Sequence, residues 1–260
     1  MTTASRNLHL PTRLKAAVVH LSLSAAVAAL TALLVFWLWF PYPYREVAGG
    51  RDLFLLILGV DVVCGPILTL VLFDPRKPRK ELVRDLSLVA LIQVAALAYG
   101  IHTMMQARPV LLAFEADRFR AVSAAEIDPD KLSQAPAGLQ TFSWAGPQTI
   151  GVRIPKPSDP DFMSNLDISM AGLDVTFRPA FWRPYDEQRA TVLQKAKPLV
   201  ELRRKHPDQA GAINRAVAEA GLAEDKLGYL PLQSRRNGDW VALVNRANAD
   251  VVGFAPVDGF

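Results

Sequence analysis

The sequence predicts a membrane protein in which a three-helix transmembrane bundle is followed by an α+β extracytoplasmic domain. Three observations support this fold class: three long apolar runs, an uneven distribution of basic residues, and a C-terminal part with mixed strand and helix patterns. The apolar runs cover residues 16–40, 53–73 and 86–106, and Asp61 is their only Asp, Glu, Lys or Arg. Each run is comparable in length to the ~20 helical residues that cross a hydrocarbon core. We therefore assign residues 1–106 to a membrane domain.

The first apolar run follows a basic start, as a signal peptide does, with Arg6, Arg13 and Lys15 ahead of it or at its edge. It is longer than the ~7–15 apolar residues of a signal-peptide core, and no Ala-x-Ala cleavage site follows it closely. We therefore expect a retained membrane anchor.

Basic residues predict the orientation of the three helices. The N-terminal tail is basic, and the loop over residues 74–85 carries five Lys or Arg. The loop over residues 41–52 carries only Arg45 and Arg51. Because short cytoplasmic loops are enriched in Lys and Arg, the N-terminus and the 74–85 loop are expected in the cytoplasm. Three crossings then place residues 107–260 on the opposite side, as a separate α+β domain.

The net charge of +4 follows from this orientation. Residues 1–106 contain 10 basic and 6 acidic residues, whereas residues 107–260 contain 19 of each. The excess therefore belongs to the membrane part, and no stripe of basic and aromatic residues indicates a nucleic-acid partner. The single cysteine, Cys64, lies in the second apolar run, so the C-terminal domain is expected to fold without disulfides.

The C-terminal domain is predicted to mix strands and helices. Residues 108–124 suggest a strand pair, and residues 148–154 suggest a further strand. Residues 186–205 have a helical pattern interrupted near Pro198, and residues 207–222 form a second helix. Strands joined by tight turns are then expected over residues 229–257.

We find no catalytic or ligand-binding motif in the C-terminal domain. It has no G-x-S-x-G, H-E-x-x-H or Cys-x-x-Cys sequence and no phosphate-binding loop. Its one histidine, His206, lies beside a proline at a polar junction between two helices. We therefore expect no enzyme activity, no metal or other cofactor, and no small-molecule substrate.

Asp61 is the most unusual residue of the membrane domain, because a carboxyl group inside a bilayer is costly and usually functional. At 1.5 Å per helical residue, Asp61, Thr31 and Tyr99 lie at similar depths, ~18–21 Å from the inner face. One interpretation is that Asp61 is neutral and hydrogen-bonds to Tyr99 or Thr31, which holds the helices in register. A second is that Asp61 faces the transmembrane helix of a partner. A proton or ion path is the third.

Gly65 and Pro66 follow Asp61 in the same apolar run. Pro66 cannot donate a hydrogen bond to the carbonyl of Val62, so a bend is expected beside Asp61. Gly59 and Gly65 leave room for a neighbouring helix to approach closely. Asp61, Gly65, Pro66 and Tyr99 are therefore our candidate residues for intramembrane helix packing or for contact with a partner.

Residues 59–100, GVDVVCGPILTLVLFDPRKPRKELVRDLSLVALIQVAALAYG, resemble the membrane region of the TfpX/TfpZ family of type IV pilin accessory proteins. The shared features are G-x-D-x-x-x-G-P-I-L-T-L, a basic loop with RDL, and a glutamine in the third helix. Residues 229–258 are similar to the end of that family. The resemblance implies a protein of the bacterial inner membrane, with a periplasmic C-terminal domain, that supports a type IV major pilin as a chaperone or stability factor. It implies no catalytic residues, and the expected partners are that pilin and membrane lipid.

Two other classes of function remain open from the sequence. A small transporter or channel subunit needs several polar residues along a path, and only Asp61, Gln93, Tyr99 and His102 qualify. A membrane-anchored periplasmic enzyme needs a convergent catalytic set within residues 107–260, and no such set is readable.

Overall fold

The computed structural model describes residues 10–160, 162–170, 172, 174–236 and 238–260, with the side chains of Val60 and Asp61 outside this description. Contacts divide the chain into two units. The first, here called the helical unit, contains the residues up to Leu38 together with Gly50–Gln106. The second, here called the C-terminal unit, contains Trp39–Gly49 together with Ala107–Phe260.

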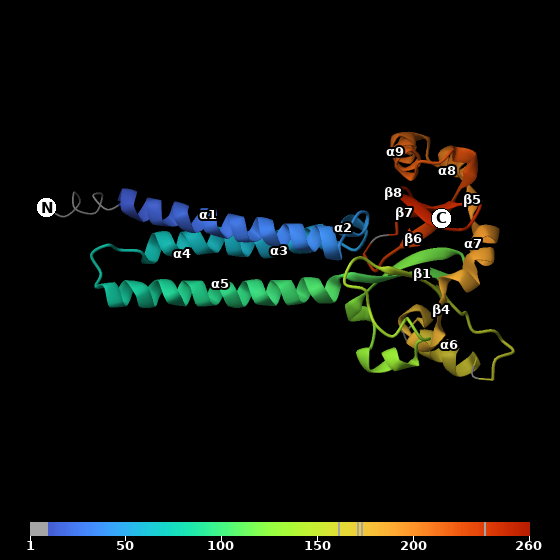
Figure 1. Ribbon diagram of the computed structural model, residues 1–260, viewed down its shortest axis with the longest axis horizontal. Helices are drawn as coiled ribbons and strands as arrows, with labels where there is room; N and C mark the ends of the chain where they lie inside the picture. The colour runs from blue at the N-terminus through green and yellow to red at the C-terminus, as the bar shows by residue number, and fades with distance from the viewer. Residues whose placement is uncertain (1–9, 161, 171, 173, 237) are drawn as a thin grey trace. The chain divides into compact units, whose positions relative to one another are not determined.

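The helical unit consists of three long helices (Figure 1). The first is α1 (Leu10–Leu34), continued by the π-helix η2 (Val35–Trp39). The second combines α3 (Gly50–Gly59), the π-helix η3 (Val60–Cys64) and α4 (Gly65–Leu72), and the third is α5 (Arg79–Ala107). All three are long and apolar enough to cross a membrane, by length and composition. This confirms the expected three apolar helices, although each begins a few residues earlier in the sequence than expected.

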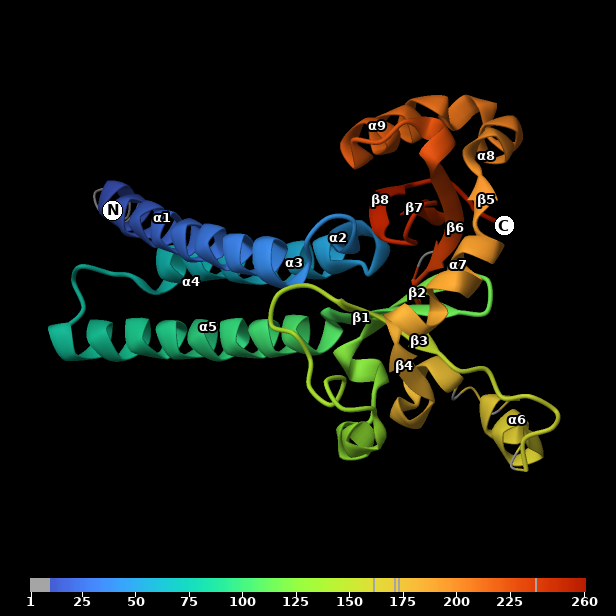
Figure 2. The ribbon, with the colours of Figure 1, turned by 45° about the vertical axis from the view of Figure 1, so that its right-hand side comes forward.

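The second helix forms the middle of the helical unit: α3 and α4 lie between α1 and α5 in both views (Figures 1 and 2). Its α4 segment packs along α1. Near the other end, Gly100 of α5 lies against Ile57 of α3, and a Cβ at Gly100 would be 2.6 Å from Ile57 Cγ2. An ion pair of 2.6 Å between Arg13 and Asp74 connects the start of α1 to the segment after α4. Contacts along the second helix therefore join it to both neighbours.

Pro66 changes the second helix without ending it. The chain stays helical from Gly50 to Leu72, but it takes the wider π form over Val60–Cys64, which ends two residues before Pro66. In a regular α-helix the proline ring would clash with the carbonyl of Val62. Because Val62 lies within η3, the wider turn accommodates the ring at the place where a bend was expected from the sequence.

The C-terminal unit contains one mixed sheet. Its strands occur in the order β4-β3-β1-β2-β6-β7-β8, and β5 pairs with β6. The pairs β1 with β3 and β2 with β6 are parallel, and the others are antiparallel. The strands are β1 (Pro109–Glu115), β2 (Arg118–Ser123), β3 (Gln148–Val152), β4 (Trp182–Pro184), β5 (Lys197–Pro198), β6 (Leu227–Gln233), β7 (Trp240–Asn245) and β8 (Val251–Ala255).

Short helices surround this sheet. They are α2 (Tyr44–Val47), α6 (Phe162–Met170), α7 (Arg189–Lys195), α8 (Leu199–Lys205) and α9 (Ala210–Ala220), with 3-10 turns between several of them. The interruption expected near Pro198 is confirmed, and its cause is visible: Lys197–Pro198 pairs with β6 as β5, which separates α7 from α8. The α+β class expected for this part of the chain is therefore confirmed.

Two cores lie on opposite faces of β6 and β7. Tyr229 and Leu243 face α8 and α9, in a core that also contains Leu202 and Ile213. The neighbouring residues Leu230 and Ala242 belong instead to the core that contains α2 and α7. Alternate residues of a strand point to opposite faces, so these near-continuous apolar strands are buried on both sides.

The segment Trp39–Gly49 is part of the second of these cores. Tyr44 and Val47 are buried there, at 5% and 0% exposure. The Tyr44 ring meets the Phe254 ring edge-on at 5.8 Å between centroids, and the Ser234 hydroxyl donates a hydrogen bond to the Val47 carbonyl. The apolar runs predict that the whole of residues 1–106 belongs to the membrane domain, whereas the contacts group this segment with the sheet of the C-terminal unit.

Candidate functional site

The helical unit contains an apolar cavity of about 660 Å³ that opens as a groove between α1 and α5. One face of α1 forms one wall, α5 forms the other, and residues of α3 and α4 contribute to the lining. Most lining residues are apolar. The polar ones are Thr12, Lys15, His20, Ser24, Thr31, Thr69 and Gln93.

Three of these polar residues form a cluster that joins the three helices. His20 of α1 lies between Thr69 of α4, with Nδ1 2.5 Å from Oγ1, and Gln93 of α5, with Nε2 2.7 Å from Oε1. An amide oxygen only accepts hydrogen bonds, so the Nε2 of His20 donates. In the neutral ring Nδ1 then accepts from the Thr69 hydroxyl. Through these two contacts, His20 uses both ring nitrogens to hold α4 and α5 against α1.

Gly65 makes this cluster possible. It is buried, and a Cβ at this position would lie 2.1 Å from Gln93 Nε2 and 3.0 Å from His20 Nε2. Thr69 follows Gly65 by one helical turn, so both residues lie on the same face of α4. Gly59, by contrast, is exposed, with nothing within 4 Å of an added Cβ. Of these two glycines, Gly65 lies close to side chains of the other two helices and Gly59 does not.

The other candidate residues are distributed differently. The backbone of Asp61 lies in η3, and its side chain lies outside the described residues. Pro66 is half-buried next to Gly65. Tyr99 is 73% exposed on α5, and the Thr31 hydroxyl donates to the Val27 carbonyl of its own helix at 2.9 Å. The structure thus places Gly65 in the polar cluster and leaves Tyr99 on the outer surface of the helical unit.

His20 is the functional candidate that the sequence reasoning missed. A single histidine in an apolar run has no spacing pattern. Thr69 appeared only as part of a family resemblance, and Gln93 appeared there and among the polar residues considered for a transport path. A signal was nevertheless available. At 1.5 Å per residue, His20, Thr69 and Gln93 all lie within ~10 Å of the expected inner ends of their helices. The depth comparison applied to Asp61 would therefore have paired them.

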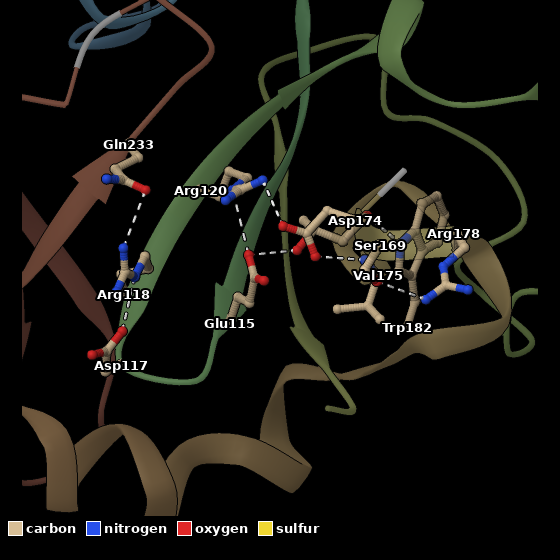
Figure 3. A network of polar contacts seen from close by, with 11 residues as sticks. Glu115, Asp117, Arg118, Arg120, Ser169, Asp174, Val175, Arg178, Trp182 and Gln233 are labelled. Carbon is tan, nitrogen blue, oxygen red and sulfur yellow. Dashed lines mark hydrogen bonds and ion pairs between the residues drawn. The ribbon is translucent and has the colours of Figure 1, made fainter. Parts of the chain in front are cut away.

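A second polar cluster lies in the C-terminal unit, between β1, β2 and the 3-10 turn η6 (Val175–Phe177) (Figure 3). The Nε of Arg120 lies 3.4 Å from a carboxylate oxygen of Glu115, and its Nη1 lies 3.2 Å from Asp174. Thr176 donates its hydroxyl to Glu115 at 2.7 Å. Burial raises the pKa of Glu115, and the adjacent Asp174 adds to this effect, whereas Thr176 and Arg120 oppose it. Glu115 of β1 contacts both Arg120 of β2 and Thr176 of η6, so this cluster joins β1 and β2 to η6.

The described part of the chain contains no group of three or more His, Cys, Asp or Glu placed to hold a metal ion. The fold and the groove define a protein with three membrane-length helices and an α+β unit, in which an apolar cavity lies among the helices. No solved structure matches this chain.

Comparisons with known proteins identify the family. The sequence pattern of the family described as "Fimbrial assembly protein FimB" matches residues 9–49. The fimbrial assembly protein of serogroup I from Dichelobacter nodosus is 34% identical over 243 residues, which cover 93% of this chain and 94% of the relative. The serogroup E1 protein of the same organism is 33% identical over 243 residues, which again cover 93% of this chain and 94% of the relative. The protein of serogroups C1 and C2 is 46% identical over 117 residues, which cover 45% of this chain and 89% of the relative. This chain belongs to the fimbrial assembly protein family.

Proposed function

We propose that this chain is a non-enzymatic accessory protein of the bacterial inner membrane, of the TfpX/TfpZ kind. It acts on a type IV major pilin before the pilus is assembled, as a chaperone or stability factor. The observation that carries this proposal is the apolar groove between α1 and α5 in the helical unit. The names of the relatives, which are fimbrial assembly proteins, support a role in pilus biogenesis.

The two units of the chain suit the two parts of such a client. A pilin before assembly has an apolar helix in the membrane and a globular head outside it. The helical unit offers a groove among membrane-length helices, and the C-terminal unit offers a separate folded domain. The cluster of His20, Thr69 and Gln93 fixes the helices, so the groove exists before any client arrives. A preformed groove lowers the ordering cost of binding.

The proposal includes a topology, with the N-terminus and the 74–85 loop in the cytoplasm and residues 107–260 in the periplasm. The core that Trp39–Gly49 shares with the sheet supports this topology. The second and third long helices come between these two parts of the chain, so two membrane crossings return the chain to the same side. A reporter that is active only outside the cytoplasm is expected to be active when fused after Phe260. The same reporter is expected to be silent within the 74–85 loop, and the reverse pattern would contradict the topology.

Deletion of this chain in its native piliated host tests the function. We expect the level of the major pilin, or the number of surface pili, to fall, and a plasmid copy to restore it. Affinity purification of the chain from native membranes is expected to recover the major pilin. Unchanged pilin and pili in the deletion strain would overturn the proposal.

Asp61 remains a proposed contact, either within the bundle or with the pilin. Asp61→Asn keeps the size and hydrogen bonding of the side chain but cannot ionise. If Asp61 is a neutral packing residue, as we propose, immunoblots of this variant will show normal levels of both this chain and the pilin. Loss of the pilin alone would instead indicate that a positive group of the pilin meets the charged carboxylate.

A further inference from the structure

We infer that the groove between α1 and α5 takes a single apolar transmembrane helix of the fimbrial subunit, which lies lengthwise along α1. This inference rests on the proposed function and specifies the contact through which it operates. Three features of the groove carry it: its length, its small lining residues and its internally bonded polar cluster.

The length of the groove matches a membrane-spanning helix. Its lining on α1 extends from Thr12 to Thr31. At 1.5 Å per residue this distance is ~28 Å, close to the ~30 Å thickness of a hydrocarbon core. A helix of ~20 apolar residues can therefore lie along the whole α1 wall, with α5 facing it over residues 86–97, whereas a compact small molecule would leave most of the α1 wall open.

Small residues line the groove where a helix backbone would approach. Ala16, Ser24 and Ala28 follow one another on α1 at intervals of one or two turns, and Ala90 stands on the opposite wall, on α5. Larger apolar side chains of α1, such as Leu23 and Val27, line the groove between these small residues. Small residues at four-residue spacing are typical of close helix–helix contacts in membranes. A flexible lipid chain needs no such stripe, so the lining favours a helix over an acyl chain.

The polar cluster determines which kind of helix fits. His20, Thr69 and Gln93 line the groove but already bond to one another. The occupant therefore needs no charged residue to neutralise them. Beside this cluster an apolar segment is sufficient, and its affinity comes mainly from close van der Waals packing against the lining residues. The charged residue Lys15 also lines the groove, close to Thr12 near the start of α1.

Site-specific photo-cross-linking in native membranes tests the occupant. A photoactivatable amino acid replaces Ala28 in the groove or, as the matched control, its exposed neighbour Ala29, which does not line the groove. We expect an adduct from position 28 whose cross-linked peptide, identified by mass spectrometry, comes from the apolar helix of a fimbrial subunit. We expect at least tenfold less of it from position 29. Adducts only with lipid, adducts with a second copy of this chain, or equal yields at both positions would overturn the inference.

Filling the groove tests the same contact without a cross-linker. Ala28→Leu combined with Ala90→Leu adds bulk to both walls, and Ala29→Leu combined with Ala95→Leu adds the same bulk outside the groove. We expect the groove pair to lower surface pili at least tenfold at an unchanged membrane level of this chain, and the control pair to have no effect.

Two results separate this inference from the proposed function. Normal piliation with the filled groove, together with lost piliation in the deletion strain, would overturn the groove contact alone. Normal piliation in the deletion strain itself would overturn the proposed function.

Discussion

At the residue scale, the polar cluster of the helical unit depends on the absence of a side chain at Gly65. An added methyl group would overlap the amide of Gln93 and press on the ring of His20. The cluster is the point at which all three helices meet through hydrogen bonds, so a displacement here affects each of them. The matched position Gly59 lies six residues earlier on the same helix and has open space around it.

We predict that Gly65→Ala destabilises the helical unit by roughly 1–3 kcal/mol, as overpacking of a well-filled interior does. Gly59→Ala should be neutral or slightly stabilising, because alanine favours helix more than glycine. Thermal unfolding of both variants, purified in the same detergent, measures the difference. Equal melting temperatures for the two variants would show that α4 and α5 do not need this close approach.

A second residue-scale prediction concerns Glu115 and pH. Its pKa is raised in the folded protein, chiefly by burial, so the folded state binds its proton more tightly than the unfolded state does. The resulting stabilisation is present below the ordinary glutamic acid pKa and is lost as pH rises through the raised value. A tenfold difference in proton affinity between the folded and unfolded states corresponds to about 1.4 kcal/mol of stability.

Glu115→Gln imitates the protonated form and removes this dependence. The melting temperature of the variant minus that of the parent protein is therefore expected to increase as pH rises from 4 to 8. Glu187→Gln, at an exposed acid of the C-terminal unit, controls for general charge effects. A difference that stays flat or decreases over this range would contradict the assigned direction of the pKa change.

The sequence was informative about single residues only where a residue was unusual in its surroundings. Asp61 and the Gly-Pro pair stood out in an apolar run, which drew attention to the part of the helix that contains Gly65. His20 did not stand out, because its importance comes from Thr69 and Gln93, which are distant in sequence. Partners of this kind are fixed by how helices pack, and packing is not encoded in the local pattern.

At the element scale, the three long helices and most strands follow from apolar periodicity, which is a local property. The short helix α2 does not, because four residues between two apolar runs look like a connecting loop. Its helical form depends on burial of Tyr44 and Val47 by strands that begin more than 60 positions later in the sequence. The same reason explains β5, whose two residues become a strand only because β6 lies beside them.

We predict that Tyr44→Ala destabilises the C-terminal unit by about 3–5 kcal/mol, the range for removing a large buried aromatic side chain. Arg45→Ala, on the adjacent residue of the same short helix, should change stability by less than about 0.5 kcal/mol, because Arg45 is exposed. Limited proteolysis of the two variants in membranes, with cleavage sites mapped to the sheet, measures the effect. Equal protease resistance would indicate that α2 is not an integral part of this core.

At the scale of the whole molecule, two separate stretches of the sequence together form the C-terminal unit. Residues 39–49 contribute to the core of the sheet formed by residues 107–260, although the second and third long helices come between them. A boundary at residue 107 was the natural expectation from composition, since apolar content changes there. Composition could not show that an earlier loop completes the later domain, because that contact joins distant parts of the chain.

This arrangement predicts how fragments of the protein behave. A fragment of residues 107–260 lacks Tyr44 and Val47, which leaves apolar surface of the sheet uncovered, at a cost of several kcal/mol, as for other losses of large buried side chains. The same fragment preceded by residues 39–49 and a flexible Gly-Ser linker regains both side chains and the bond from Ser234 to the Val47 carbonyl. We expect the second fragment to unfold cooperatively at a clearly higher temperature, and the first to aggregate or melt broadly. A third fragment with the linker and Val47→Asp controls for the linker and should behave like the first. If all three fragments melt alike, the C-terminal unit is complete without the loop, and the boundary at residue 107 stands.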